Sequence, residues 1–416
     1  MMKSFITYSE DCHFPIQNLP YGIFSSTDNP NPRGGVAIGE LVLDLSLLES
    51  EGLLPSNYFS QSNLNLFMSA GKEIWPSVRR QIQELLDENN SSLKDNSELR
   101  ERAFYCQSEV SMHLPAQIGD YTDFYSSRQH ATNVGTMFRD PNNALLPNWL
   151  HLPVGYHGRA SSVVISGTPV YRPNGQTLPM GEENPVFGPC RLMDFELEMG
   201  CFIGPGNELG EPISTENAGD HLFGLVLVND WSARDIQKWE YVPLGPFGAK
   251  NLATSISPWV IPFEALEAFR IDDPIQENPT PLPYLQCEKN WTFDMNLEVK
   301  IKSPTMTEPE TISESNYKYM YWNLAQQLAH HTITGCNMNP GDMFASGTIS
   351  GEEAGSYGSM LELAWKGTKP IQLSNGEVRK FIQDGDNIIM TGYAQGDGYR
   401  VGFGNVSGKI LPAKKQ

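Results

Sequence analysis

The chain has 416 residues, of which 39% are hydrophobic and 19% are charged, and its formal net charge is −20. This length exceeds what one compact core usually holds, so we expect a globular protein of two domains. The acidic balance argues against nucleic acid and anionic membranes as partners, because both bind to basic surfaces.

Targeting segments and disulfides are not expected either. No apolar run approaches the roughly 18 residues of a membrane span. Residues 1–11 lack the apolar region of a secretory signal peptide. The six cysteines are far apart and form no C-x-x-C pair. These features predict a cytoplasmic protein whose cysteines are reduced thiols.

The first third of the chain predicts a small β domain with appended helices. Short apolar runs at 35–38 and 41–45 flank Gly39 and Glu40, a pattern typical of a β-hairpin. Between residues 64 and 104 the spacing becomes helical, with Ile82, Leu85 and Leu86 on one face and a break at 89–92. We expect this domain to cover residues 1–116.

Residues 117–416 predict a second, β-rich domain. Strands are expected at 194–202, 222–230, 293–302 and 387–392. One helix is expected over 317–328, with Asn316 as its N-cap and Gly335 just past its end. The chain's 30 prolines and 37 glycines, together with many short strands, favour a β-rich fold over a doubly wound α/β fold.

The segment 194–198 is unusual because it carries three acids in alternation. In an extended strand Asp194, Glu196 and Glu198 would share one face, with no lysine or arginine between them. The alternating segment 295–302 instead mixes both signs on its polar face, as an ordinary wet strand does. Either water solvates the single-sign face at 194–198 or a cation binds there, and the pattern favours a metal.

Two further carboxylates are candidate partners for this face. Asp230 ends the apolar run 222–229, and Asp123 lies in a polar, aromatic loop. Sites built only from carboxylates select hard cations such as Ca²⁺ or Mg²⁺ over zinc. The alternative for each single acid is a solvated surface charge, and no EF-hand spacing is present.

A cluster of polar donors follows Asp230. If a helix begins at Trp231, Arg234 and Gln237 project together, with Tyr241 one turn further along. Lys250 follows on a loop rich in glycine and proline. Arginine, glutamine and lysine converging near a metal would stabilise a developing oxyanion. The alternative is an exposed helix face that pairs with Asp235 and Glu240.

His130 is the candidate general base, because histidine titrates near neutral pH and this one follows Asp123 in a polar stretch. A single histidine is more often structural. Glu362 lies in an apolar, strand-like run and needs a partner if it is buried. A catalytic histidine is usually held in its orientation by a third group, and the carboxylate of Glu362 could do this. Ser126 and Ser127 lack the G-x-S-x-G context of a serine hydrolase.

Several long motifs give this chain a family resemblance. These motifs are residues 123–135, 148–162, 229–237, 241–247, 345–351 and 396–404. By them the chain resembles the fumarylacetoacetase (fumarylacetoacetate hydrolase) family over nearly its whole length.

The resemblance implies a fold and an activity. The fold would be a mainly β chain with an N-terminal SH3-like β-barrel, a C-terminal mixed β-sandwich roll over 117–416, and a homodimer. The activity would be hydrolysis of the carbon–carbon bond of 4-fumarylacetoacetate to fumarate and acetoacetate, the last step of tyrosine and phenylalanine breakdown. Alternatives are a related β-diketo acid hydrolase or decarboxylase, or a non-catalytic cation-binding protein.

The resemblance also implies a role for each candidate site residue, but none for Asp194. The family often has glycine where Ala253 stands, so a required positive φ there would shift the second cation site. The implied roles are Ca²⁺ ligands at Asp123, Glu196, Glu198 and Asp230; Mg²⁺ at Asp230, Lys250 and Thr254; a base at His130 paired with Glu362; an oxyanion pocket of Arg234, Gln237 and Lys250; and substrate contacts at Tyr125, Arg139, Tyr156, Gln237, Tyr241 and Thr348.

Overall fold

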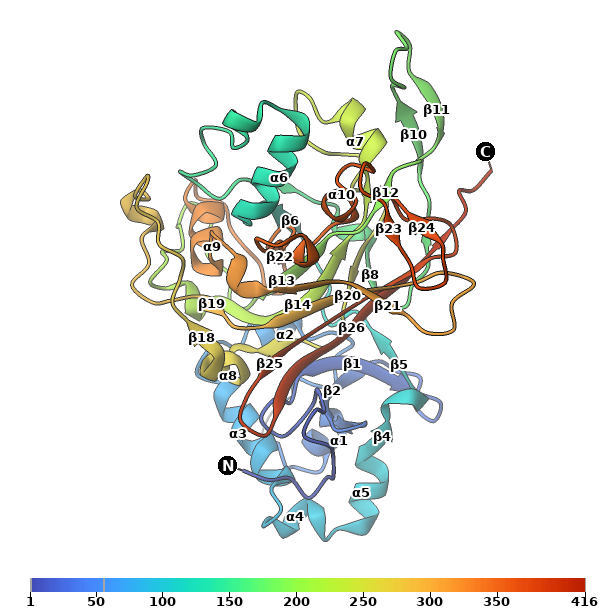
Figure 1. Ribbon diagram of the computed structural model, residues 1–416. Coiled ribbons are helices and arrows are strands. Elements are labelled where there is room, and N and C mark those ends of the chain that lie inside the picture. The colour runs from blue at the N-terminus through green and yellow to red at the C-terminus, as the bar shows by residue number, and fades with distance from the viewer. Residues whose placement is uncertain (1, 55–56, 416) are drawn as a thin grey trace.

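The computed structural model describes residues 2–54 and 57–415 (Figure 1). Its N-terminal part is built on a five-stranded antiparallel sheet in the order β4-β3-β2-β1-β5. The strands are β1 (Tyr21–Ser26), β2 (Arg33–Ile38), β3 (Leu41–Asp44), β4 (Phe104–Cys106) and β5 (Val110–His113). The expected hairpin is confirmed as β2–β3, where Ile38 faces Leu41 and Gly39 turns the chain with a φ of +57°.

Four of the helices of this part lie in the expected region 64–104, and α1 precedes it. The helices are α1 (Leu45–Ser50), α2 (Asn65–Met68), α3 (Trp75–Leu86), α4 (Ser91–Lys94) and α5 (Ser97–Ala103). Ile82, Leu85 and Leu86 lie on the buried face of α3, as predicted. The expected break is also confirmed, since Asn90 caps a new helix by accepting a hydrogen bond from the Ser92 amide.

A mixed sheet that carries most of the candidate site residues forms the centre of the molecule. Its order is β7-β6-β22-β13-β14-β16-β8, and β17 pairs separately with β14. The pairs β6·β22 and β8·β16 are parallel and the others antiparallel. The strands are β6 (Tyr121–Phe124), β7 (Gly155–His157), β8 (Val163–Ile165), β13 (Leu197–Ile203), β14 (Leu222–Asp230), β16 (Thr254–Ile256), β17 (Ile261–Pro262) and β22 (Met343–Ala345).

A second sheet packs against the first, and its long strands β25 and β26 cross the middle of the molecule (Figure 1). Its strands are β9 (Val170–Tyr171), β20 (Asn296–Lys302), β21 (Glu310–Asn316), β25 (Asn387–Gln395) and β26 (Arg400–Leu411), in the order β21-β20-β25-β26-β9. Leu227 of the first sheet shares one core with Val299, Met390 and Phe403 of the second. Apolar side chains buried between two sheets stabilise such a sandwich.

Short strand pairs and helices complete the C-terminal part, and α6, α7 and α10 gather at one end of it (Figure 1). The pairs are β10 (Asn174–Thr177) with β11 (Val186–Pro189), β12 (Met193–Asp194) with β15 (Ser232–Ala233), β18 (Arg270–Ile271) with β19 (Thr292–Phe293), and β23 (Ile371–Gln372) with β24 (Val378–Arg379). The helices are α6 (Arg128–Phe138), α7 (Arg234–Glu240), α8 (Phe263–Leu266), α9 (Leu324–Thr332) and α10 (Met360–Leu363).

The mainly β architecture is confirmed, but the helix predicted over 317–328 is confirmed only in its second half. Asn316 caps only a short 3₁₀ turn, and α9 begins at Leu324. There Asn323 and Gln326 form a reciprocal capping box, which satisfies the amides of the first helical turn. The apolar spacing of residues 317–322 arises because Tyr317, Met320 and Trp322 are buried without being helical.

Two further local expectations need correction. The strand expected over 194–202 is interrupted, since β12 ends at Asp194 and β13 begins at Leu197. Helix α7 begins at Arg234 and not at Trp231, which is buried beside β15. The six cysteines are all free. Within the part of the chain that the structure describes, no helix is long and apolar enough to cross a membrane.

Candidate active site and metal centre

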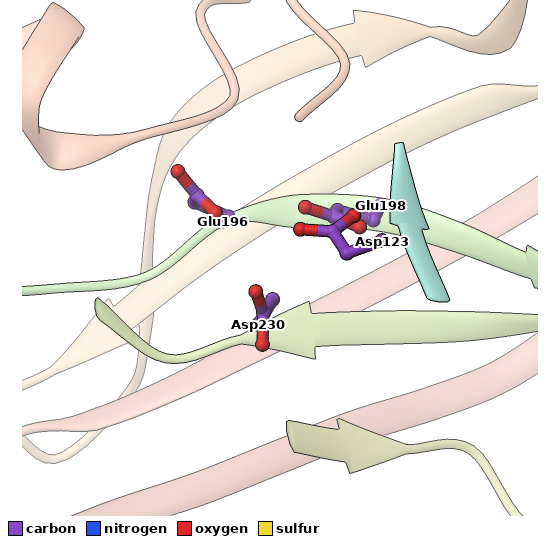
Figure 2. A group of neighbouring side chains, drawn as sticks. All are labelled: Asp123, Glu196, Glu198 and Asp230. Carbon is purple, nitrogen blue, oxygen red and sulfur yellow. The ribbon is translucent and has the colours of Figure 1, made fainter. Parts of the chain in front are cut away.

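Four buried carboxylates meet at the end of the central sheet. Each of Asp123, Glu196, Glu198 and Asp230 has an oxygen within 4.8 Å of the others. Figure 2 shows Asp123 and Glu198 side by side, with Asp230 at the tip of β14. The antiparallel pairing of β13 with β14 brings Glu198 and Asp230 together, and β6 supplies Asp123 from across β22. Folding thus collects the acids that were expected to act together.

Two of these acids lack the partners that a buried carboxylate needs. Both side-chain oxygens of Glu198 and the Oδ1 atom of Asp123 are buried without a hydrogen bond from the described residues. Burial, and then the neighbouring Asp230, raise the pKa of Asp123 well above its ordinary value. Burial and the nearby Asp123 and Asp230 do the same to the pKa of Glu198. Buried like charges of this kind fit a divalent cation with oxygen ligands.

Glu196 differs from these two because two cations contact it. Arg234 donates from Nη2 to Oε1 across 2.6 Å, and the Nζ atom of Lys250 donates to Oε2. Burial raises the pKa of Glu196, but Arg234, Lys250 and His130 outweigh this effect, so the net shift is downward. Glu196 is therefore ionised and ion-paired, and it joins the carboxylate cluster to the polar donors.

Asp194 lies beside the cluster but belongs to a different arrangement. Its Oδ2 atom accepts a hydrogen bond from Nε of Arg234 at 2.7 Å. The main-chain amide of Met360 donates to Oδ1 of Asp194 at 2.7 Å, and that of Leu361 donates to Oδ2 at 3.1 Å. The expectation that three acids share one face does not hold, because the strand is interrupted between Asp194 and Leu197. Asp194 is not in the four-acid cluster and instead holds Arg234 and the start of α10.

Lys250, Thr254 and Tyr156 all donate to Asp230. Thr254 donates to Oδ1 at 2.7 Å, while Lys250 and Tyr156 donate to Oδ2 at 2.7 and 3.1 Å. Nearby carboxylates raise the pKa of Lys250 although burial lowers it, so the amine is a stable cation. Ala253 is not among the residues with positive φ, so an alanine there imposes no left-handed backbone strain.

The predicted histidine and glutamate meet in the interior. Nδ1 of His130 lies 2.6 Å from Oε2 of Glu362, and both side chains are buried. Asn133 Nδ2 donates to Oε1 of Glu362 at 2.9 Å, and the hydroxyls of Ser350 and Ser359 donate to Oε2 at 2.9 and 2.7 Å. Glu362 lies on the short helix α10 and not in a strand, but its expected need for a partner is confirmed.

The remaining residues predicted to contact the substrate or the oxyanion differ in how deeply they are buried. Gln237 Oε1 accepts from Nη1 of Arg234 at 3.2 Å, and the Tyr125 ring packs edge-on against His130 with centroids 5.2 Å apart. Arg139 and Tyr241 are exposed, and Thr348 is buried. Arg139 donates from Nε and Nη2 to the carbonyl oxygen of Ala144.

Sequence reasoning missed one buried side chain at the cluster. Tyr121 precedes Asp123 by two residues on β6, and its hydroxyl is buried without a hydrogen-bond partner among the described residues. Burial raises its pKa well above the ordinary value, and the carboxylates of Asp230, Asp123 and Glu198 add to this rise. The alternation of side chains along a strand was the available signal, since it places Tyr121 and Asp123 on one face.

Comparisons with known proteins show the family of this chain. Residues 17–115 match the family described as "Fumarylacetoacetase N-terminal", and residues 120–407 match "Fumarylacetoacetate (FAA) hydrolase C-terminal". Fumarylacetoacetase of Homo sapiens is 59% identical over 415 residues, which is 99% of both chains. That of Dictyostelium discoideum is 60% identical over 425 residues, covering 100% of this chain and 99% of the relative.

Solved structures show the same fold at low identity. A fumarylacetoacetate hydrolase from Exiguobacterium antarcticum superposes with a TM-score of 0.53 at 17% identity, covering 95% of this chain and 99% of that one. A maleylpyruvate hydrolase from Sphingobium superposes with a TM-score of 0.50 at 14% identity, covering 95% and 100%. The chain belongs to the fumarylacetoacetase family.

Proposed function

We propose that this protein is an enzyme that hydrolyses the carbon–carbon bond of 4-fumarylacetoacetate, giving fumarate and acetoacetate in tyrosine and phenylalanine breakdown. The observation that carries this proposal is identity of 48–60% with curated fumarylacetoacetases over 98–100% of the sequence of each. The buried His130–Glu362 pair beside a carboxylate cluster supplies the chemistry that such a reaction needs.

The carboxylate cluster is the proposed cation site. Asp123, Glu196, Glu198 and Asp230 would hold Ca²⁺, supported by the unpartnered oxygens of Glu198 and Asp123. Asp230, Lys250 and Thr254 would mark a second site, for Mg²⁺. Asp230 and Thr254 would supply its oxygen ligands, and the ammonium of Lys250, which is a donor and not a ligand, would hold Asp230 beside it. A bound cation would supply Lewis-acid stabilisation to the oxygens of the diketone.

His130 would act as the general base. Its Nδ1 atom faces Glu362, which leaves Nε2 to accept a proton from water. Glu362 would fix the orientation of the ring, and Asn133, Ser350 and Ser359 hold Glu362 in place. The water deprotonated by His130 would attack the carbonyl carbon beside the bond that breaks. The electron pair of that bond would leave with the acetoacetate carbon, which would then take up the proton held by His130.

Arg234, Gln237 and Lys250 would stabilise the alkoxide formed by this attack. The hydrogen bond from Arg234 to Oε1 of Gln237 turns the Gln237 amide donors away from Arg234. Lys250 uses two of its three donors on Glu196 and Asp230, so one remains. Tyr125, Arg139, Tyr156, Gln237, Tyr241 and Thr348 would contact the substrate.

The folds of the two domains, their boundary, the oligomeric state and the location belong to the same proposal. The N-terminal sheet would form an SH3-like barrel, and the C-terminal part a mixed β-sandwich roll. The domain boundary would lie near residue 116, between the ranges that match the two family descriptions. The protein would act as a homodimer in the cytoplasm.

An assay of purified protein tests this function. Loss of 4-fumarylacetoacetate is followed with and without a chelator, and fumarate and acetoacetate are identified as products. We expect turnover that falls when the chelator removes the cation. Turnover of a different β-diketo acid alone would favour a related hydrolase or decarboxylase. A folded, cation-loaded protein that consumes no substrate would refute the catalytic proposal.

A further inference from the structure

One buried arginine lacks the partner that the others have. Arg33 pairs with Asp44, Arg234 with Asp194 and Glu196, and Arg379 with Asp386 and Glu377. Arg79 is just as buried, with 7% of its surface exposed, yet no carboxylate of the described residues pairs with it. A buried guanidinium without a counter-ion is costly, so a structure seldom keeps one without a use for it.

The hydrogen bonds of Arg79 leave part of its guanidinium unused. It lies in the middle of α3, and its Nη2 atom donates to the main-chain oxygens of Gln17 and Asn18. Its Nε atom is buried and has no hydrogen-bond partner among the described residues. Two main-chain oxygens accept hydrogen bonds but carry no full negative charge. The carboxylate of Glu264 attracts Arg79 through space, but the two form no ion pair, so burial still lowers the pKa of Arg79 on balance.

Arg79 lines a cavity of about 370 Å³ between the N-terminal and C-terminal parts of the chain. Gln17, Arg80 and Gln83 line it from the N-terminal side, and Glu264 and Tyr399 from the C-terminal side. Figure 1 shows α3 beside α8 and the loop between β25 and β26. Two arginines against one glutamate make the wall locally positive, in a chain whose net charge is −20. The volume suits a small molecule.

We propose that this cavity binds a small anion through a carboxylate-like or sulfate-like oxyanion group, which supplies the direct ion-pair partner that Arg79 lacks among the described residues. Arg80 adds a second positive charge at the exposed side of the cavity. Glu264 opposes the anion, and its carboxylate weakens binding. Because the cavity wall comes from both parts of the chain, the bound anion stabilises their contact, and its binding appears as a rise in unfolding temperature.

Thermal unfolding of the full chain tests this inference, with sodium sulfate and sodium acetate as probes and sodium chloride matching the ionic strength. The two probes separate a tetrahedral from a planar oxyanion as the preferred shape. We expect a saturable rise in unfolding temperature with at least one of them. Arg79→Met should raise the half-saturating concentration about tenfold or more, since the buried charge is lost. Arg102→Met, an exposed arginine paired with Glu51, is the matched control and should change nothing.

Glu264→Gln keeps the test decisive if Arg79→Met does not fold. Removing the opposing carboxylate should lower the half-saturating concentration about threefold or more. Half-saturation shifted in opposite directions by Arg79→Met and Glu264→Gln supports the site. An unfolding temperature that shows no saturable response to either anion overturns it. A half-saturating anion concentration that is the same in Glu264→Gln and in the wild type also overturns it. The outcome does not depend on the proposed hydrolase activity, because none of these residues touches the carboxylate cluster.

Discussion

His130 and Glu362 are separated by 232 positions in the chain, yet Nδ1 and Oε2 lie 2.6 Å apart in the protein interior. Glu362 reaches this position because Ser359 caps α10 and Asp194 accepts hydrogen bonds from the first amides of the same helix. The geometry of the candidate base therefore depends on a carboxylate that contacts neither the histidine nor the proposed cation.

Replacing His130 by alanine should remove turnover and leave cation binding nearly intact. The rate of 4-fumarylacetoacetate loss should fall about 10²–10⁴-fold, the usual contribution of a general base. Calorimetric titration with Ca²⁺ should give an affinity close to that of the wild type, because His130 is not among the four clustered acids. Near-normal turnover in this variant would rule out His130 as the base.

Replacing Glu362 by glutamine should change the acid stability of the protein as well as its turnover. Burial raises the pKa of Glu362, but His130, Asn133 and Ser359 together lower it by more, so the net shift is downward. A depressed carboxyl pKa stabilises the fold above the unfolded value of about 4.3, and this stability is lost as the pH falls through the folded value. Below about pH 4.3 the wild type should therefore lose stability more steeply than Glu362→Gln.

Denaturant unfolding between pH 6 and pH 3, in the presence of a chelator, measures this difference. If the unfolding free energy of the variant falls with pH as steeply as that of the wild type, ionised Glu362 does not stabilise the fold. Turnover at neutral pH, measured on the same samples, should fall because the amide no longer orients His130.

Asp194→Asn should destabilise the fold without removing the cation site. The buried Arg234 would lose one of its two carboxylate partners, which costs about 3 kcal/mol in typical cases. The unfolding free energy should fall accordingly, while the Ca²⁺ affinity of the folded protein should change less than in Glu198→Gln. Turnover should also fall, because α10 carries Glu362. A large loss of cation affinity in this variant would instead make Asp194 a ligand.

Glu198→Gln should shift stability in opposite directions with and without cation. In chelator the variant should unfold at a higher temperature than the wild type, because one of several buried like charges is gone. Adding Ca²⁺ should raise the unfolding temperature of the wild type more than that of the variant, since removing a charged ligand weakens binding about tenfold or more. Differential scanning calorimetry in both conditions decides the point. If the variant and the wild type gain equally from Ca²⁺, Glu198 is not a ligand.

Tyr121→Phe should also separate cation affinity from stability. The Tyr121 hydroxyl has no hydrogen-bond partner among the described residues. In the cation-free protein, the unfolding temperature of the variant should therefore equal or exceed that of the wild type. Cation affinity should fall about tenfold, as when a group just outside the ligand shell is removed. Tyr317 is the matched control, because its hydroxyl is also buried and unpartnered but lies by Cys201 and Asp273. Equal affinities for Tyr121→Phe and Tyr317→Phe would assign Tyr121 no role at the site.

Local sequence patterns determined several parts of this protein. The hairpin β2–β3, the buried strand Leu222–Asp230 and the apolar face of α3 follow from residue spacing, because each depends on contacts within a short segment. The long motifs around Asp123, Asp230 and Ser346 were sufficient to indicate the family. The residue types at Glu196 and Glu198 were sufficient to suggest a hard cation.

Only the tertiary structure decided which acids share a centre and what each one contacts. Asp194, Glu196 and Glu198 look equivalent in the sequence, but Arg234 and Lys250 arrive from distant segments and pair with the first two. Glu198 meets Asp123 and Asp230 with no cation of the described chain beside it. The same holds for α9, whose start depends on Asn323 and Gln326 and not on apolar spacing. Partners brought together by folding set the charge balance of a buried group, and local spacing carries no record of them.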